Sequence, residues 1–337
     1  MLNLKTYAEA QLALPKNLPD LLQITITYKS KEYTLDMTTA SLGSDFEILE
    51  HNADGLHHLG LPPFKLYRGD VQGIPNSLAA AMLLPDGRLD AFVRIGDQNF
   101  SIHPNIQESI SGQDHILYEF ELDNSNREHQ MPLMPAEEAM ETISKAPSTQ
   151  KYSAVLGLDC AYDYVELCGG KEETILNVVS SLNKVFAIYL TDLGIQYNSG
   201  LLVLRTDKAT CPYSGITKIN ECLDKMKETW NQDYSNSRFY TNAQLITSAF
   251  PGSGLTFLNT VCNKFWSYGV SGSNYNGNLK QFDIVLRHEM GHTWGAPDLP
   301  GKCLAGKTIM CGNQLPYFSP YTVNLIKGIA AKKPCLT

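Results

Sequence analysis

The sequence predicts a mostly-β front half followed by an α/β back half built on a mixed sheet. Three observations carry this prediction. The 337 residues exceed one typical domain. Short runs of alternating apolar residues, typical of strands, occupy the chain up to residue 123, whereas strands and helices alternate from residue 151 onward. All eight cysteines lie after residue 159. We therefore expect a mostly-β domain over residues 1–123, a linker over 124–150 and an α/β domain over 151–337.

Within the front half, a period of two in apolar residues predicts strands over residues 22–28, 91–95 and 116–122. The dipeptide Asp86-Gly87 predicts a tight hairpin turn. The segment 124–150 is polar, is interrupted by three prolines and has no strong apolar period. These features indicate a linker with one short helix at most.

In the back half, apolar periods of two and of 3.6 residues alternate along the chain. The helical period is clearest between Glu173 and Leu190. The predicted strands cover residues 152–159, 195 with 201–205, 242–247 and 254–262, and the predicted helices cover 173–190, 219–230, a segment that begins near Phe282, and 322–331.

The helix that begins near Phe282 carries the most informative pattern, His288-Glu289-x-x-His292-x-x-Gly295-x-x-Asp298. Residues four apart share one helix face, so both imidazoles can reach a single metal ion. Glu289 suits a general base that takes a proton from a zinc-bound water. Gly295 can end the helix and turn the chain, which lets Asp298 act as a third ligand and leaves a fourth position open. A packing helix can carry two histidines at this spacing as well, but the added glycine and aspartate favour a zinc site.

Met310 stands in a tight segment 12 residues after Asp298. Most buried methionines only fill gaps in a core. The pairing of Met310 with the upstream histidine pattern instead indicates a methionine turn beneath the metal.

The histidine pattern and Met310 together resemble the signature of the metzincin metallopeptidases. The front half adds a more specific resemblance, because its turns and glycines are similar to the pro-domain of the adamalysin (reprolysin) family. The matching segments are Tyr67–Gly73, Pro75–Ser77, Asp86–Leu89 and Phe100–Pro104. The resemblance implies a metzincin-type catalytic domain with one catalytic zinc ion and peptide substrates. The chain departs from most members at Asp298, where they have a third histidine.

By the same resemblance, the edge strand above the cleft pairs with an extended substrate, which implicates Gly254, Leu255 and Thr256. Tyr317 would help to form the pocket for the residue beyond the cut, and it is equally suited to a core position.

Adamalysin-type pro-domains silence the enzyme by placing a cysteine thiolate on the zinc. The front half of this chain has no cysteine, so another group would have to block the metal. Carboxylates and imidazoles are suitable donors, and His129 lies near where the family's cysteine would be. We therefore expect the segment 127–138 to cross the cleft and to block the metal through His129, Glu137 or Glu138. Steric blockade without a metal contact is the alternative.

The confinement of all eight cysteines to the back half indicates a disulfide framework and an oxidising compartment, with free thiols as the alternative. The first residues of the chain lack a signal-peptide pattern, which fits a secreted protein whose signal has been removed. Short separations favour the pairs Cys160–Cys168, Cys211–Cys222 and Cys303–Cys311, which leaves Cys262–Cys335.

The net charge of −8 at pH 7 argues against a nucleic-acid partner. A run of about 18 apolar residues, the sign of a membrane span, is missing from the sequence. The leading prediction is a monomeric, secreted zinc endopeptidase in zymogen form, whose pro-domain blocks the cleft without a cysteine. One alternative is a protease-like binding or toxin module with weak turnover. The other is a cytosolic metal hydrolase that acts on something other than peptides. Intact Glu289 favours the peptidase, and calcium dependence is not readable from the sequence.

Overall fold

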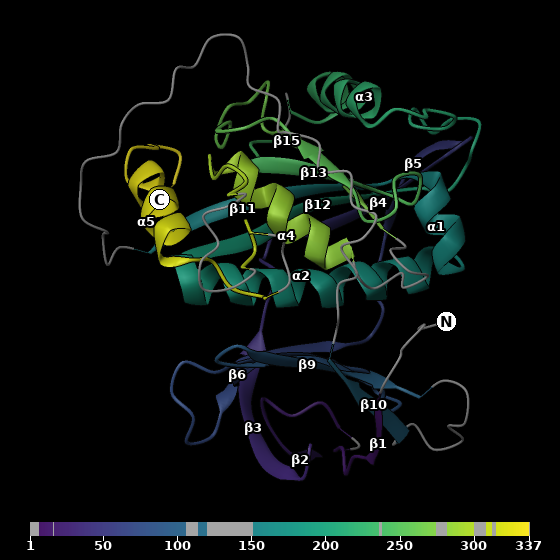
Figure 1. The fold of residues 1–337 in the computed structure, drawn as a ribbon. Helices are drawn as coiled ribbons and strands as arrows, with labels where there is room; N and C mark the ends of the chain where they lie inside the picture. The colour runs from purple at the N-terminus through teal and green to yellow at the C-terminus, as the bar shows by residue number, and fades with distance from the viewer. Residues whose placement is uncertain are drawn as a thin grey trace.

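The computed structural model describes residues 7–15, 17–105, 114–119, 151–235, 238–273, 282–299, 308–311 and 315–336. In this part of the chain two sheets lie on opposite sides of the long helix α2 (Figure 1). The strands are β1 (Ala8–Gln11), β2 (Leu21–Tyr28), β3 (Lys31–Ala40), β4 (Glu47–Asn52), β5 (Gly55–Leu59), β6 (Lys65–Val71), β7 (Leu78–Leu83), β8 (Leu89–Ile95), β9 (Gln98–Pro104), β10 (Asp114–Tyr118), β11 (Tyr152–Cys160), β12 (Ile195–Arg205), β13 (Asn242–Thr247), β14 (Gly254–Thr256) and β15 (Tyr268–Gly272). The helices are α1 (Tyr162–Cys168), α2 (Lys171–Leu193), α3 (Ile219–Asp233), α4 (Phe282–Thr293) and α5 (Pro320–Ala330).

The first sheet is antiparallel and belongs wholly to the front half, in the strand order β1-β10-β9-β8-β7-β6-β3-β2. One face carries its own apolar core, and the other face packs on α2 through residues such as Leu66, Ala80 and Phe92. Strand β7 is buried along its whole length, as its sequence of apolar residues without polar alternation would require.

The second sheet is mixed, in the order β14-β15-β13-β11-β12-β4-β5. Strands β11, β12, β13 and β15 are parallel, and β14 runs antiparallel at one edge. The predicted α/β class with a mixed sheet is therefore confirmed. The strand predicted over residues 254–262 is shorter, because the chain turns from Asn259, and the two predicted strands at 195 and 201–205 are one continuous strand.

The front half also contributes to the second sheet. Strand β4 pairs in parallel with β12, from Leu201 opposite Glu47 to Arg205 opposite His51, and β5 adds the outer strand. The domain boundary near residue 123 stays a prediction. The second sheet includes β4 and β5, which precede that boundary, so the two sheets do not correspond to its two sides. A strand pairing across about 150 residues leaves no local signature in the sequence, which is why the sequence did not indicate it.

Helix α2 is the central helix of the fold. Its length and composition would allow it to cross a membrane, yet 89% of its apolar 18-residue stretch is buried inside the protein. Among the described residues it is the only such helix. Its buried apolar residues join a core cluster that includes side chains of both halves, so α2 connects the front half to the back half.

The disulfides correct part of the sequence-based expectation. Cys262 and Cys335 are joined, as expected. Cys160, Cys168, Cys211 and Cys222 are free thiols, so the pairs Cys160–Cys168 and Cys211–Cys222 are wrong. A short separation along the chain brings each pair to the same core cluster, but a disulfide also needs a specific geometry that sequence separation does not supply. Burial raises the pKa of all four thiols, that of Cys222 to about 12, which disfavours the reactive thiolate. Cys311 is disulfide-bonded, and its expected partner Cys303 lies outside the described residues.

Candidate metal centre

Helix α4 presents the histidine pattern as predicted and ends where Gly295 was expected to end it. Gly295 has a φ of 83°, the left-handed conformation that favours glycine. The amide of Ala296 then donates to the carbonyl of Gly291 over 3.0 Å, closing the helix end. A Cβ atom at position 295 would lie 2.6 Å from Ile329 of α5, so the tight packing also requires glycine. This turn brings Asp298 back toward the two histidines.

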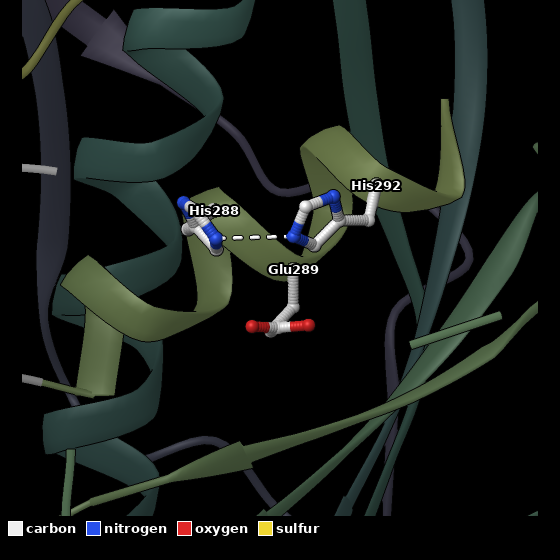
Figure 2. Close-up of side chains that lie close together, drawn as sticks. All are labelled: His288, Glu289 and His292. Atoms are coloured by element: carbon white, nitrogen blue, oxygen red, sulfur yellow. Dashed lines mark hydrogen bonds between the residues drawn. The ribbon is translucent and has the colours of Figure 1, made fainter. Parts of the chain in front are cut away.

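The side chains of His288, His292 and Asp298 meet at one point. The Nε2 atoms of the two histidines are 3.0 Å apart (Figure 2). Asp298 Oδ1 lies 3.2 Å from His288 Nε2 and 3.7 Å from His292 Nε2. Zinc–ligand bonds of about 2.0–2.1 Å place tetrahedral donors about 3.4 Å from one another. The three donor atoms therefore fit one zinc ion, with a further coordination position left over.

The Nδ1 atoms of the two histidines are held by backbone carbonyls. His288 Nδ1 lies 2.7 Å from the oxygen of Ile309, and His292 Nδ1 lies 2.7 Å from the oxygen of Ala296. A carbonyl accepts only, so each Nδ1 carries the proton and each Nε2 lone pair is available to a metal. Burial alone would lower the pKa of His288, but the hydrogen bond to Asp298 and the charges of Glu289 and Asp298 raise it.

Glu289 is the alternative third ligand, since its carboxylate and the two histidines have ligand atoms within 4.8 Å of one another. Asp298 Oδ1, at 3.2 Å and 3.7 Å from the two Nε2 atoms, is placed for the same role. Figure 2 shows the Glu289 carboxylate below the two imidazoles. That position leaves Glu289 available as a base.

Strand β14 passes directly over Glu289. A Cβ atom at Gly254 would overlap the Glu289 carboxylate, so this position has room only for glycine. Leu255 and Thr256 are almost fully buried, with 2% and 0% of their surface exposed. Of the residues proposed to bind substrate, Leu255 and Thr256 can therefore offer only backbone groups at this sheet edge.

Met310 lies beneath the helix, as the sequence predicted for a methionine turn. It is 1% exposed. Its sulfur fills the space left by the missing side chain of Gly291, where a Cβ atom would lie 2.5 Å from Sδ. The carbonyl of Met310 accepts from the amide of Leu299 over 3.1 Å, which secures the chain next to Asp298.

The side chain of Tyr317 reaches the front half. Its hydroxyl donates to Asp97 Oδ1 over 2.9 Å. Burial, together with this hydrogen bond, raises the pKa of Tyr317 to about 12. The latency candidates His129, Glu137 and Glu138 lie outside the described residues.

Sequence reasoning missed the groups that orient the ligands, and most of them are backbone atoms. The carbonyls of Ile309 and Ala296 have no residue-type signature. A second support is a chain of side chains in which Trp294 donates to the Tyr197 hydroxyl over 2.7 Å and Tyr197 donates to Asn242 over 2.9 Å. All three residues are buried, and together they hold the C-terminal end of α4 against the sheet.

Comparisons with known proteins agree with this site. Residues 148–319 match the model of Metallo-peptidase family M12 (Reprolysin_5), which is just over half of the chain. The chain is 26% identical over 313 residues to "Disintegrin and metalloproteinase domain-containing protein 32" of Mus musculus, covering 86% of this chain and 39% of the relative. It is also 32% identical over 89 residues to "Snake venom metalloproteinase atroxlysin-1" of Bothrops atrox, covering 26% of this chain and 44% of the relative.

A solved structure extends the likeness to both halves. The fold is similar to that of metalloproteinase-II from Bacteroides fragilis, with a TM-score of 0.52, 13% identity and 91% of each chain covered. At this identity the likeness concerns the fold alone. The chain spans about two fifths of the mouse relative's length. The family model covers more than half of the chain and the histidine geometry agrees with it, so this chain belongs to Metallo-peptidase family M12 and is similar to the adamalysin (reprolysin) type.

Proposed function

We propose that this protein hydrolyses internal peptide bonds with one zinc ion held by His288, His292 and Asp298, and with Glu289 as the general base. The observation that carries the proposal is the convergence of three donor atoms within 3.7 Å of one another, with both Nδ1 atoms already engaged. Family membership supports zinc as the metal.

When bound, zinc would polarise the scissile carbonyl and make a water molecule more acidic. Glu289 takes the proton of the attacking water and then delivers it to the leaving amine. Glu289 is 4% exposed, and β14 confines its carboxylate on one side. The carboxylate would therefore hold the proton at a site with little access to solvent. Low exposure strengthens every electrostatic interaction at this position.

The substrate would lie extended along β14, the edge strand of the second sheet. The strand order ends at β14, so its outer backbone groups have no neighbouring strand among the described residues. Because Leu255 and Thr256 are buried, recognition begins with backbone hydrogen bonds, as in strand addition. Side-chain selectivity then comes from elsewhere in the cleft, including the segment around Tyr317.

The front half would act as a pro-domain, and the chain would be a secreted, monomeric zymogen. The contact between Tyr317 and Asp97 of the front half supports this, since it engages the segment that follows the methionine turn. The disulfide between Cys262 and Cys335 supports an extracellular location. A donor in 127–138, with His129, Glu137 and Glu138 as candidates, is proposed to block the zinc in place of a cysteine.

The test is a quenched-peptide assay of wild type, Glu289→Gln and the surface control Glu172→Gln, each with its zinc content measured. The assay is run before and after limited proteolysis between β10 and β11. Wild type and Glu172→Gln should cleave peptides after proteolysis, lose activity to a chelator and regain it with zinc. Glu289→Gln should keep its zinc and lose about 10²–10⁴-fold in rate, the usual contribution of a general base. Equal rates for wild type and Glu289→Gln would reject the enzyme and favour the binding-module alternative.

A further inference from the structure

A buried ion pair joins the front half to the end of α2. Arg94 of β8 donates to Asp192 through Nη2 over 2.8 Å and through Nη1 over 3.2 Å. The side chains are only 6% and 9% exposed. Two forked hydrogen bonds in a dry interface fix both groups more tightly than a surface ion pair would.

The same pair holds the segment that follows the methionine turn. Arg94 Nη1 also donates to the carbonyl of Pro316 over 2.9 Å, and Asp192 Oδ2 accepts from the amide of Phe318 over 3.0 Å. The Phe318 ring packs edge-on against Tyr189 of α2, with 5.1 Å between ring centroids. The segment from Pro316 to Phe318 is therefore held on both sides by one charged pair.

This segment in turn supports a metal ligand. The carbonyl of Tyr317, between the two held residues, accepts from the amide of Ile309 over 3.0 Å. The carbonyl of the same Ile309 binds His288 Nδ1 over 2.7 Å. Ile309 is fully buried, so solvent cannot replace either hydrogen bond.

From this continuous series of contacts we infer that Arg94 and Asp192 are positioning residues for the zinc site, acting through Pro316–Phe318 and Ile309 on His288. The inference rests on the proposed function, in which His288 is a zinc ligand. It gives the front half a second role, besides any blocking group: Arg94 completes the support of a ligand that lies in the other half. Partners that orient a ligating histidine typically change metal affinity about 10- to 100-fold when removed.

The experiment measures the rate at which zinc leaves the full-length protein to a colorimetric chelator. Arg94→Ala should release zinc about 10-fold faster or more. The matched control is Arg68→Ala. Arg68 also reaches α2 from the first sheet, donating to Asn183 over 2.8 Å, but within the described part of the chain it makes no hydrogen bond to the Pro316–Phe318 segment. Arg68→Ala should lower stability without changing the zinc release rate.

Arg94→Lys is the second variant, for use if Arg94→Ala does not fold. Its ammonium keeps the charge beside Asp192 but cannot reproduce the three hydrogen bonds that Arg94 donates to Asp192 and Pro316. It should give an intermediate release rate. The absorption spectrum of the cobalt-substituted protein adds a readout of ligand geometry, and it should shift in the Arg94 variants only. Equal zinc release from wild type and both Arg94 variants, or an equal acceleration by Arg68→Ala, would overturn the inference. Failure of wild type to bind zinc would instead reject the proposed function.

Discussion

At the scale of single residues, the meeting of His288, His292 and Asp298 was predictable because it depends on spacing within one helix and on the turn that follows it. Residues 288 and 292 share a face, and Gly295 ends the helix at the point that returns Asp298. What the sequence could not supply is the set of backbone carbonyls that select the histidine tautomers. Any residue can offer a carbonyl, so Ile309 and Ala296 became visible only in three dimensions.

Gly254 offers a prediction at this scale. A methyl group at position 254 would push the Glu289 side chain out of place, and a displacement of about 1 Å in a catalytic group costs about 100-fold in rate. We expect Gly254→Ala to lower kcat by about that factor while zinc content stays constant. Gly60→Ala is the control, because a Cβ atom at Gly60 would meet nothing within 4 Å.

The cause can be checked without activity. In a Glu289→Ala background the carboxylate that the methyl group of Gly254→Ala would meet is gone. The Gly254→Ala substitution should therefore no longer lower the free energy of unfolding. An equal loss in the free energy of unfolding in both backgrounds would show that the clash is with something other than Glu289.

At the scale of elements, the sequence predicted most of the helices and some of the strands, but it left out several strands, including the ten-residue β3. Helix α2 and strand β13 follow the predicted bounds closely. The short helix α1 and the five-residue strand β15 escaped prediction because each contains too few residues to show a period. The pairs Cys160–Cys168 and Cys211–Cys222 failed for a different reason, since sequence separation says nothing about the direction of a Cβ–Sγ bond.

The disulfide gives the element-scale prediction. It ties Cys262 to the segment after α5, across 73 residues, and α5 packs where Gly295 ends the metal-binding helix. Cys335→Ser should lower the free energy of unfolding by about 2–4 kcal/mol, as measured in guanidinium chloride under non-reducing conditions. The free thiol Cys168 provides the control, and a loss of the same size in Cys168→Ser would mean that the bond itself adds little.

At the scale of the whole molecule, the two halves share more than a linker. Strand β4 completes the second sheet, Arg94 is paired with Asp192, and Lys184 of α2 lies 2.8 Å from Asp90 of β8. The apolar cluster around α2 also includes side chains of both halves. None of these contacts is local in sequence, so composition and periodicity did not indicate them.

A single cut between β10 and β11 should therefore leave the halves associated. We expect the two fragments to elute together in size-exclusion chromatography at neutral pH and to separate only in denaturant. If a donor in 127–138 blocks the zinc, activity should rise upon the cut while the fragments are still bound. Spontaneous separation of the fragments would show that the shared contacts are too weak to hold the halves together.

The central claim is that His288, His292 and Asp298 hold one zinc ion. Its most direct test is zinc-edge X-ray absorption on the purified wild type and on Asp298→Ala. Wild type should contain one zinc per chain with at least two imidazole nitrogens at about 2.0 Å, oxygen donors and no sulfur, and Asp298→Ala should lose zinc or an oxygen donor. Full zinc occupancy with unchanged coordination in Asp298→Ala, or sulfur in the coordination shell, would contradict it.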